Sequence, residues 1–158
     1  MIARILVALD ASSRAPGVLA AAADMAVSFG ASLTPFRALT IPPDFPPSAH
    51  VAMGDPLPEY LREEAVRGLR ALVDTLAAGA TVSEPIVRIG QPWRVILWTA
   101  DELDVDLIVL GSHGYYGLDR ILGTTAAKVA NLARRNVLVV HNRIEPPPSS
   151  GAMLSGGT

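Results

Sequence analysis

Small, hydroxyl-bearing and acidic residues follow two apolar runs of this sequence and precede one helical pattern: Asp10, Ser12 and Ser13, then Gly111 and Gly114, then Gly123, Thr124 and Thr125. Glycine allows a ligand to lie against bare backbone. The free N–H groups at the start of a helix favour an anion. Together these residue types suit a nucleotide, with its phosphates at the helix start after Gly123 and its ribose near Asp10.

The same residues also have a purely structural explanation. A glycine loop before a helix often only makes a tight turn, and a single G-x-x-G is a weak signal. Thr124 is a good helix cap without any ligand, and Asp10 could cap the first helix. The residues alone therefore leave phosphate binding and a simple turn equally open.

More specific catalytic motifs are absent from the sequence. It has no G-x-x-x-x-G-K-[ST] loop, no G-x-G-x-x-G after the first apolar run and no G-x-S-x-G elbow. Its histidines, His50, His113 and His141, have no spacing typical of a zinc site. Ser112 and His113 are adjacent, and adjacent side chains usually point apart, so we expect His113 to shape the loop or face a phosphate rather than to form a dyad.

These residues must be positioned by alternating strands and helices. Apolar or β-branched runs typical of strands occupy residues 4–9, 32–39, 84–89, 106–110 and 136–140. Helical periodicity appears between them at Val18–Phe29, Leu61–Leu76, Val95–Leu103 and Val129–Ala133, and Pro92 suits a first helical turn. The pattern predicts an α/β fold with an open five-stranded parallel sheet and helices on both faces.

An open parallel sheet binds ligands beyond the carboxyl ends of its strands, where neighbouring connections leave on opposite faces. The first strand ends just before Asp10, and the fourth ends just before Gly111. If these two strands are neighbours, Asp10 faces the glycine loop across the crevice between them.

Composition narrows the functional classes. The chain has 158 residues, no cysteine and a formal net charge of -2. That charge argues against a nucleic-acid partner, and no apolar run reaches the ~18 residues that a membrane span needs. With no signal-peptide pattern at the start, we expect a cytoplasmic protein.

Two segments fall outside the alternation. Residues 40–58 contain six prolines and should form an irregular excursion after the second strand. Residues 145–158 are rich in proline, serine and glycine, so we predict a domain over residues 1–144 and a disordered tail over 145–158.

Three stretches give the chain a resemblance to the universal stress protein family: "ILVALDASS", "GQPWRVILWTADELDVDLIVLGSHG" and "GTTAAKVANLARRNVLVV". The resemblance runs from about residue 3 to residue 141. It implies a Rossmann-like sheet with strand order 3-2-1-4-5, which makes the first and fourth strands neighbours. It also implies a homodimer joined through the last strand, from Asn136 to His141.

Nucleotide-binding members of that family share a G-x2-G-x9-G-[ST] signature and hold ATP. Gly111, Gly114, Gly123 and Thr124 resemble its fixed positions. Asp10 resembles the acidic residue near the ribose, from which it could also reach a magnesium ion on the phosphates. The cofactor-binding residues that we expect are Ala8, Asp10, Ser12, Ala38, Leu110, Gly111, His113, Gly114, Gly123, Thr124 and Thr125, with Ala38 meeting adenine through its backbone.

The sequence departs from that pattern at two places. Eight residues, not nine, separate Gly114 from Gly123, and one residue fewer shortens the reach by up to ~3.5 Å. We therefore expect AMP or ADP to bind about as well as ATP. Pro35 lies inside the second strand, where proline cannot donate to the ladder, so a bulge there is expected.

The sequence thus predicts an ATP-binding universal stress protein that acts as a nucleotide-dependent switch, with at most slow hydrolysis because no dedicated base, arginine finger or loop lysine is found. Two alternatives stay open. One is a family member without nucleotide that works through contacts with an unknown protein partner. The other is a small enzyme that uses the same crevice for an anionic metabolite.

Overall fold

The computed structural model describes residues 1–41, 57–112 and 123–141. In chain order its elements are β1 (Arg4–Ala8), α1 (Ala15–Phe29), β2 (Ser32–Leu39), α2 (Leu57–Val73), β3 (Thr81–Val82), β4 (Ile86–Ile89), α3 (Pro92–Glu102), β5 (Leu107–Gly111), α4 (Thr124–Leu132) and β6 (Asn136–Val140). Within these residues no helix combines the length and apolarity needed to span a membrane. Most of the proline-rich excursion and the whole predicted tail lie outside the described residues, so the predicted boundary at residue 144 stays a prediction.

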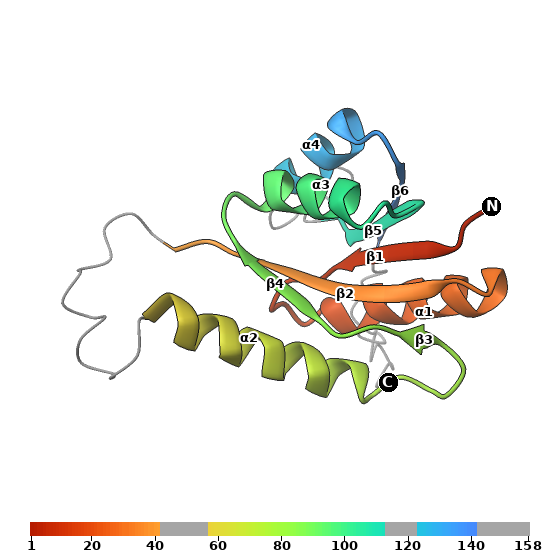
Figure 1. Ribbon diagram of the computed structural model, residues 1–158, viewed down its shortest axis with the longest axis horizontal. Coiled ribbons are helices and arrows are strands. Elements are labelled where there is room, and N and C mark those ends of the chain that lie inside the picture. Colours follow the sequence, from red (N-terminus) through yellow and green to blue (C-terminus); the bar gives the residue numbers. More distant parts are fainter. Residues whose placement is uncertain (42–56, 113–122, 142–158) are drawn as a thin grey trace, which may run out of the picture.

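The strands form one parallel sheet in the order β3-β2-β1-β5-β6, and β4 also pairs with β2. Helices α1 and α2 cover one face, and α3 and α4 cover the other (Figure 1). This confirms the predicted doubly wound α/β fold and its strand order. In particular β1 and β5, the first and fourth predicted strands, are neighbours.

Apolar residues on both faces of the central strands make the core. Ile5 and Val7 of β1 pack under α1 and α2, whereas Leu6 of β1 and Phe36 of β2 pack under α3 and α4. All four side chains are fully buried. Burial on both faces explains why these strands show continuous apolar runs instead of a period of two.

The strand predicted over residues 84–89 is β4, which begins at Ile86, and a further short strand, β3, precedes it and was not predicted. Both pair with successive parts of β2. β3 pairs at Ser32 and Leu33, and β4 pairs from Phe36 onward, so the gap between them lies opposite Pro35.

Pro35 explains that gap. In a parallel ladder, successive residues turn their N–H and C=O groups to opposite neighbours. Phe36 accepts from Leu9 N–H at 2.8 Å and Leu33 accepts from Ser83 N–H at 2.9 Å, so Pro35 faces the β3–β4 side. The missing donor therefore falls where no strand pairs, and the register with β1 runs through Pro35↔Val7 without the expected bulge.

The helical periodicities were right except near helix ends. Pro92 begins α3 as expected. Leu76 lies beyond the end of α2 but still packs against the core. Within the periodicity expected over Val129–Ala133, Val129 is buried but Ala130 is exposed, and Ala126 before it is buried as well.

Candidate ligand-binding cavity

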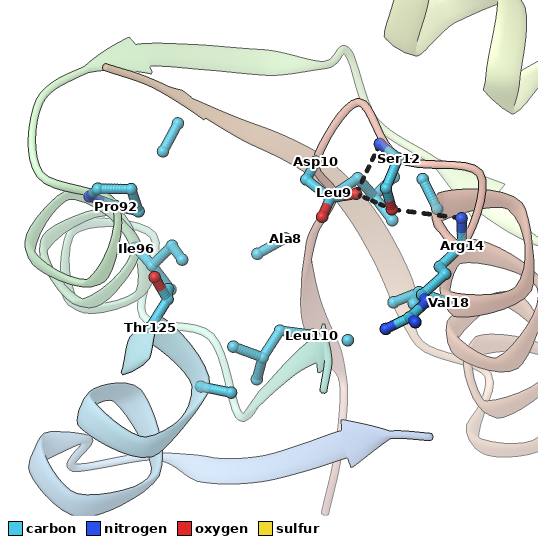
Figure 2. Close-up of a pocket in the computed structure, with 14 residues that line it drawn as sticks. Ala8, Leu9, Asp10, Ser12, Arg14, Val18, Pro92, Ile96, Leu110 and Thr125 are labelled. Atoms are coloured by element: carbon cyan, nitrogen blue, oxygen red, sulfur yellow. Dashed lines mark hydrogen bonds between the residues drawn. The ribbon is translucent and has the colours of Figure 1, made fainter. Parts of the chain in front are cut away.

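A cavity of about 250 Å³ lies at the carboxyl ends of β1 and β5. Its floor comes from these strands, and its walls come from the starts of α1, α3 and α4 (Figure 2). The lining residues are Ala8, Leu9, Asp10, Ser12, Arg14, Ala15, Val18, Ala38, Pro92, Ile96, Leu110, Gly111, Thr125 and Ala126. The crevice predicted between the first and fourth strands is therefore a real cavity.

Asp10 organises the turn between β1 and α1. Its Oδ1 accepts a bond from the Ser12 backbone N–H at 3.0 Å and another from the Ser12 hydroxyl at 2.6 Å. Ser12 Oγ in turn accepts the Arg14 N–H at 3.2 Å. Helix α1 has Arg14 as its N-cap residue, without a side-chain capping bond. Asp10 thus shapes the turn that precedes the helix and is not the helix cap that the structural alternative assumed.

Arg37 supports the tip of β1 from the α1–α2 side of the sheet. Its Nη2 donates to the Asp10 carbonyl at 2.9 Å and its Nε to the Leu9 carbonyl at 3.3 Å. Partial burial lowers the pKa of the Arg37 guanidinium, and the nearby Asp10 carboxylate opposes that shift. The half-buried cation therefore fixes the backbone that carries Asp10.

Ala38 lies where β1 and β2 separate. Their register ends at Ala8↔Phe36, followed by the bond from Leu9 N–H to the Phe36 carbonyl. By the alternation of a parallel ladder, the Ala38 peptide groups face the same side as those of Phe36. The backbone of Ala38 is thus directed toward the cavity end of β1, where an edge of a planar base would find a donor and an acceptor.

Helix α4 begins beside the cavity without a side-chain cap. Gly123 is its N-cap residue, and no side-chain capping bond is made there within the described residues. Thr124 is the first helical residue and is exposed, so it is not the cap that the turn-only explanation proposed. Thr125 lines the cavity and brings its hydroxyl to the rim.

Gly111 marks a close approach between β5 and α1. A Cβ placed on Gly111 would lie 3.1 Å from Val18 Cγ2, which is tighter than ordinary packing. Packing against Val18 alone therefore gives a structural reason for this glycine, whether or not a ligand also needs it.

Seven of the eleven residues predicted for the site line this one cavity: Ala8, Asp10, Ser12, Ala38, Leu110, Gly111 and Thr125. Gly123 and Thr124 are described but are not among the lining residues. His113 and Gly114 lie outside the described residues. The expected effect of the eight-residue spacing between Gly114 and Gly123 therefore stays a prediction. The prediction that the ends of the first and fourth strands lie together is correct, because the carboxyl ends of neighbouring parallel strands lie at the same edge of the sheet.

Seven lining residues were missed: Leu9, Arg14, Ala15, Val18, Pro92, Ile96 and Ala126. Most belong to the first turns of helices, which start at the same edge of the sheet. The sequence contained part of the information needed to find them. Arg14 lies only four residues after Asp10, and Pro92 marks the start of a helix at the same edge of the sheet. Which helical side chains turn inward depends on packing that spacing alone does not give.

The cavity combines apolar walls with a few polar groups. Alanine, leucine, isoleucine and proline side chains form most of its surface, and Asp10 and Arg14 are the charged side chains among the described lining residues. Such a site suits a ligand with a flat apolar part and a polar or anionic end.

An open parallel sheet with helices on both faces and a cavity at the carboxyl ends of its central strands defines a doubly wound, Rossmann-like α/β domain. The chain belongs to the universal stress protein family, whose family model matches residues 1–141.

Individual relatives agree with this assignment. A universal stress protein from Synechocystis sp. is 31% identical over 150 residues, covering 88% of this chain and 97% of that protein. The solved universal stress protein UspA from Lactobacillus plantarum superposes with a TM-score of 0.70 at 25% identity, covering 88% of this chain and 97% of that one. A universal stress protein solved in complex with cAMP has a TM-score of 0.62 at 27% identity, covering 89% and 97% of the two chains.

Proposed function

We propose that this universal stress protein binds an adenine nucleotide in the cavity between β1 and β5 and acts as a nucleotide-dependent switch in the stress response. The observation that carries the proposal is the convergence of Asp10, Ala38, Gly111 and Thr125 on one cavity. The relative solved with cAMP supports the adenine nucleotide as a ligand class.

The chemistry of the lining residues fits the parts of a nucleotide. The apolar side chains Ile96, Leu110 and Pro92 would pack against the base, and the backbone of Ala38 would meet its polar edge. The Asp10 carboxylate would accept bonds from ribose hydroxyls. Thr125 and the start of α4 would face phosphate oxygens.

A magnesium ion fits this site only together with the ligand. Mg²⁺ is usually held by one or two carboxylates and by substrate phosphates, with water completing its shell. Asp10 would supply one carboxylate and the phosphates the other oxygens. ATP, and equally ADP or AMP given the short spacing before Gly123, are the proposed ligands, and any hydrolysis is expected to be slow.

The remaining parts of the proposal concern setting and assembly. We expect a cytoplasmic homodimer joined through the last strand. The switch would act by changing contacts with a protein partner when the nucleotide binds, since ligands shift a protein toward the state that they bind better.

The first experiment is mass analysis of small molecules released from freshly purified protein, followed by calorimetric titration of ligand-free protein with Mg-ATP, ADP and AMP. Released adenine nucleotide, or binding in the micromolar range, is the expected result. No binding of any adenine nucleotide at millimolar concentration would contradict the proposal and favour a family member that works through protein contacts alone.

A further inference from the structure

Arg14 is the positively charged side chain among the described residues that line the cavity. It is half-buried at the start of α1. Its backbone N–H donates to Ser12 Oγ at 3.2 Å, and the Ser12 hydroxyl donates to Asp10 Oδ1 at 2.6 Å. This chain of bonds fixes the backbone of Arg14 relative to the Asp10 carboxylate.

The guanidinium lies on a defined wall of the cavity. Figure 2 shows it by Val18, across the cavity from Ile96 and Thr125. The close packing of Val18 against Gly111 holds the start of α1 against the end of β5. Because most neighbouring walls are apolar, a charge here is screened less than it would be in open water.

The two charges divide the cavity between different ligand groups. The Asp10 carboxylate attracts hydroxyl donors and repels a phosphate. A guanidinium matches phosphate oxygens with two parallel N–H bonds. The cavity volume of about 250 Å³ is slightly below the ~300–1,000 Å³ of typical ligand pockets, so a residue that lines this cavity would meet the phosphate nearest the nucleoside before a more distant one.

We propose that Arg14 is a specificity-determining residue that recognises the phosphate attached to the ribose, so that the site binds nucleoside phosphates more tightly than uncharged nucleosides. This inference rests on the proposed nucleotide-binding function and names the group on the ligand that Arg14 reads. It predicts that Arg14 contributes to binding of AMP and ATP alike, and that it contributes nothing to binding of adenosine.

The test is calorimetric titration of the full chain with adenosine, AMP and ATP, for the wild type and for Arg14→Met, Arg14→Lys and Arg67→Met. Arg67 is an exposed arginine on α2, away from the cavity, so Arg67→Met controls for the loss of one positive charge. Thermal melting of each variant shows whether it folds. The Arg14 side chain makes no capping bond at the start of α1, so we expect Arg14→Met to fold.

We expect wild type to bind AMP about ten- to a hundredfold more tightly than adenosine, which corresponds to a charge-assisted hydrogen bond. Arg14→Met should remove most of that ratio and leave adenosine affinity unchanged. Arg14→Lys should retain part of the ratio, and Arg67→Met all of it. The wild-type preference for AMP should also weaken as salt increases, and this salt dependence should decrease in Arg14→Met.

Two results separate the failure of this inference from the failure of the proposed function. If the wild type binds adenine nucleotides and Arg14→Met keeps the AMP-to-adenosine ratio, Arg14 does not read the phosphate and the proposed function still stands. If the wild type binds none of the three ligands, the proposed function is overturned and the inference falls with it.

Discussion

Asp10 stabilises the turn before α1 through its hydrogen bonds with Ser12, and by our proposal it also binds the ribose of the ligand. Two substitutions separate these roles. Asp10→Asn keeps a side-chain oxygen that can accept from Ser12, whose N–H and hydroxyl now bind Oδ1 at 3.0 and 2.6 Å. Asp10→Ala removes that acceptor and should lower the free energy of unfolding by about 1 kcal/mol. Both should weaken nucleotide binding, as measured by calorimetry, whereas only the alanine variant should unfold at lower denaturant. Unchanged affinity in both variants would assign Asp10 to the turn alone.

Arg37 is a positioning residue for the same turn, because its guanidinium holds the carbonyls of Leu9 and Asp10. Arg37→Met keeps the aliphatic stem but leaves the part-buried Leu9 carbonyl and the exposed Asp10 carbonyl without this donor. We expect the free energy of unfolding to fall by about 1–2 kcal/mol. AMP affinity should fall as well, because the backbone of Asp10 loses its support. Denaturant unfolding and calorimetry measure the two effects, and a variant as stable as the wild type would show that water replaces the guanidinium without cost.

Some residues of the site could be predicted from the sequence and others could not, and Asp10, Gly111 and Arg37 show why. Asp10 and Gly111 were found from the sequence because each directly follows an apolar run typical of a strand, and all strands of a parallel sheet have their carboxyl ends at one edge. For Arg37, the position within the second strand does not by itself decide between the sheet face and the rim. The alternation of side chains along β2 places Arg37 on the face of the sheet covered by α1 and α2. Its long side chain nevertheless reaches the carbonyls of Leu9 and Asp10 at the rim. Backbone periodicity does not encode that reach.

At the scale of elements, β2 shows why the short strand β3 was not predicted and why β4 begins later than expected. The sequence suggested a bulge at Pro35 and a continuous strand over residues 84–89. The structure instead places Pro35 opposite the break between β3 and β4, and Pro85 lies within that break. The two prolines are far apart in the sequence, and their effects combine only once the register is known. The low strand propensity of proline therefore predicted an irregularity near Pro35. It did not indicate that β2 would stay regular and that the neighbouring strand would be interrupted.

Helix α2 contains a glycine that the fold does not require. Gly68 lies within the helix, and a Cβ there would stand 3.5 Å from Arg37 Nη1, an ordinary contact distance. Glycine inside a helix costs about 0.5–1 kcal/mol relative to alanine. Gly68→Ala should therefore raise the free energy of unfolding by about that amount, as measured by denaturant titration.

Gly30→Ala provides the contrast to that substitution. Gly30 ends α1 with φ of 64°, in the left-handed region, and no atom lies within 4 Å of its would-be Cβ. The replacement of Gly30 by alanine should lower the free energy of unfolding by about 1 kcal/mol through backbone strain alone, in the same denaturant titration.

The opposite result for the first substitution would contradict our expectation. If Gly68→Ala lowers the free energy of unfolding, the position of the Arg37 side chain depends on the space beside Gly68.

At the scale of the whole molecule, a charged cluster joins three distant parts of the chain at the amino ends of the strands. Asp104 Oδ2 accepts from Arg4 at 2.6 Å, and its Oδ1 accepts from Arg135 at 2.8 Å. Asp106 Oδ2 accepts the backbone N–H groups of Ala3 and Arg4. The hydrogen bond from Arg135 is the largest cause that lowers the pKa of Asp104, and the bond from Ala3 is the largest that lowers the pKa of Asp106.

These lowered pKa values predict how stability depends on pH. A carboxyl whose pKa is lower in the folded state stabilises the fold above its unfolded pKa, which is about 3.9 for aspartate. That contribution is lost as the pH falls below this value and through the folded pKa. The free energy of unfolding should therefore decrease from pH 5 to pH 3, as measured by urea titration.

Two variants test this dependence on pH. Asp104→Asn should flatten it, because asparagine tolerates the left-handed backbone at φ of 47° but carries no titrating charge. Glu63→Gln, on the exposed surface of α2, removes a carboxylate away from the cluster and should flatten it less. Equal slopes for these two variants would argue against the cluster as the source.

The edge strand β6 is the remaining feature at this scale, and it carries the prediction of a dimer. Within the described residues β6 pairs only with β5. The bond from Ser112 N–H to the Val140 carbonyl at 2.9 Å shows that Val140, and by alternation Leu138, face β5. The peptide groups of Val137 and Val139 therefore face outward. An apolar edge with outward donors invites pairing with another chain, and two-fold symmetry lets β6 pair with its own copy.

A matched pair of proline substitutions tests that edge. Val139→Pro removes only an outward donor, so it should weaken the dimer by at least about tenfold and leave the monomer folded. Leu138→Pro removes a donor that faces β5, so it should destabilise the monomer itself. Sedimentation of each variant from about 1 to 100 μM, with circular dichroism to follow folding, distinguishes the two effects. Wild-type protein that stays monomeric over this range would rule out the β6 dimer, and a Val139→Pro dimer as tight as the wild type would place the interface on another surface.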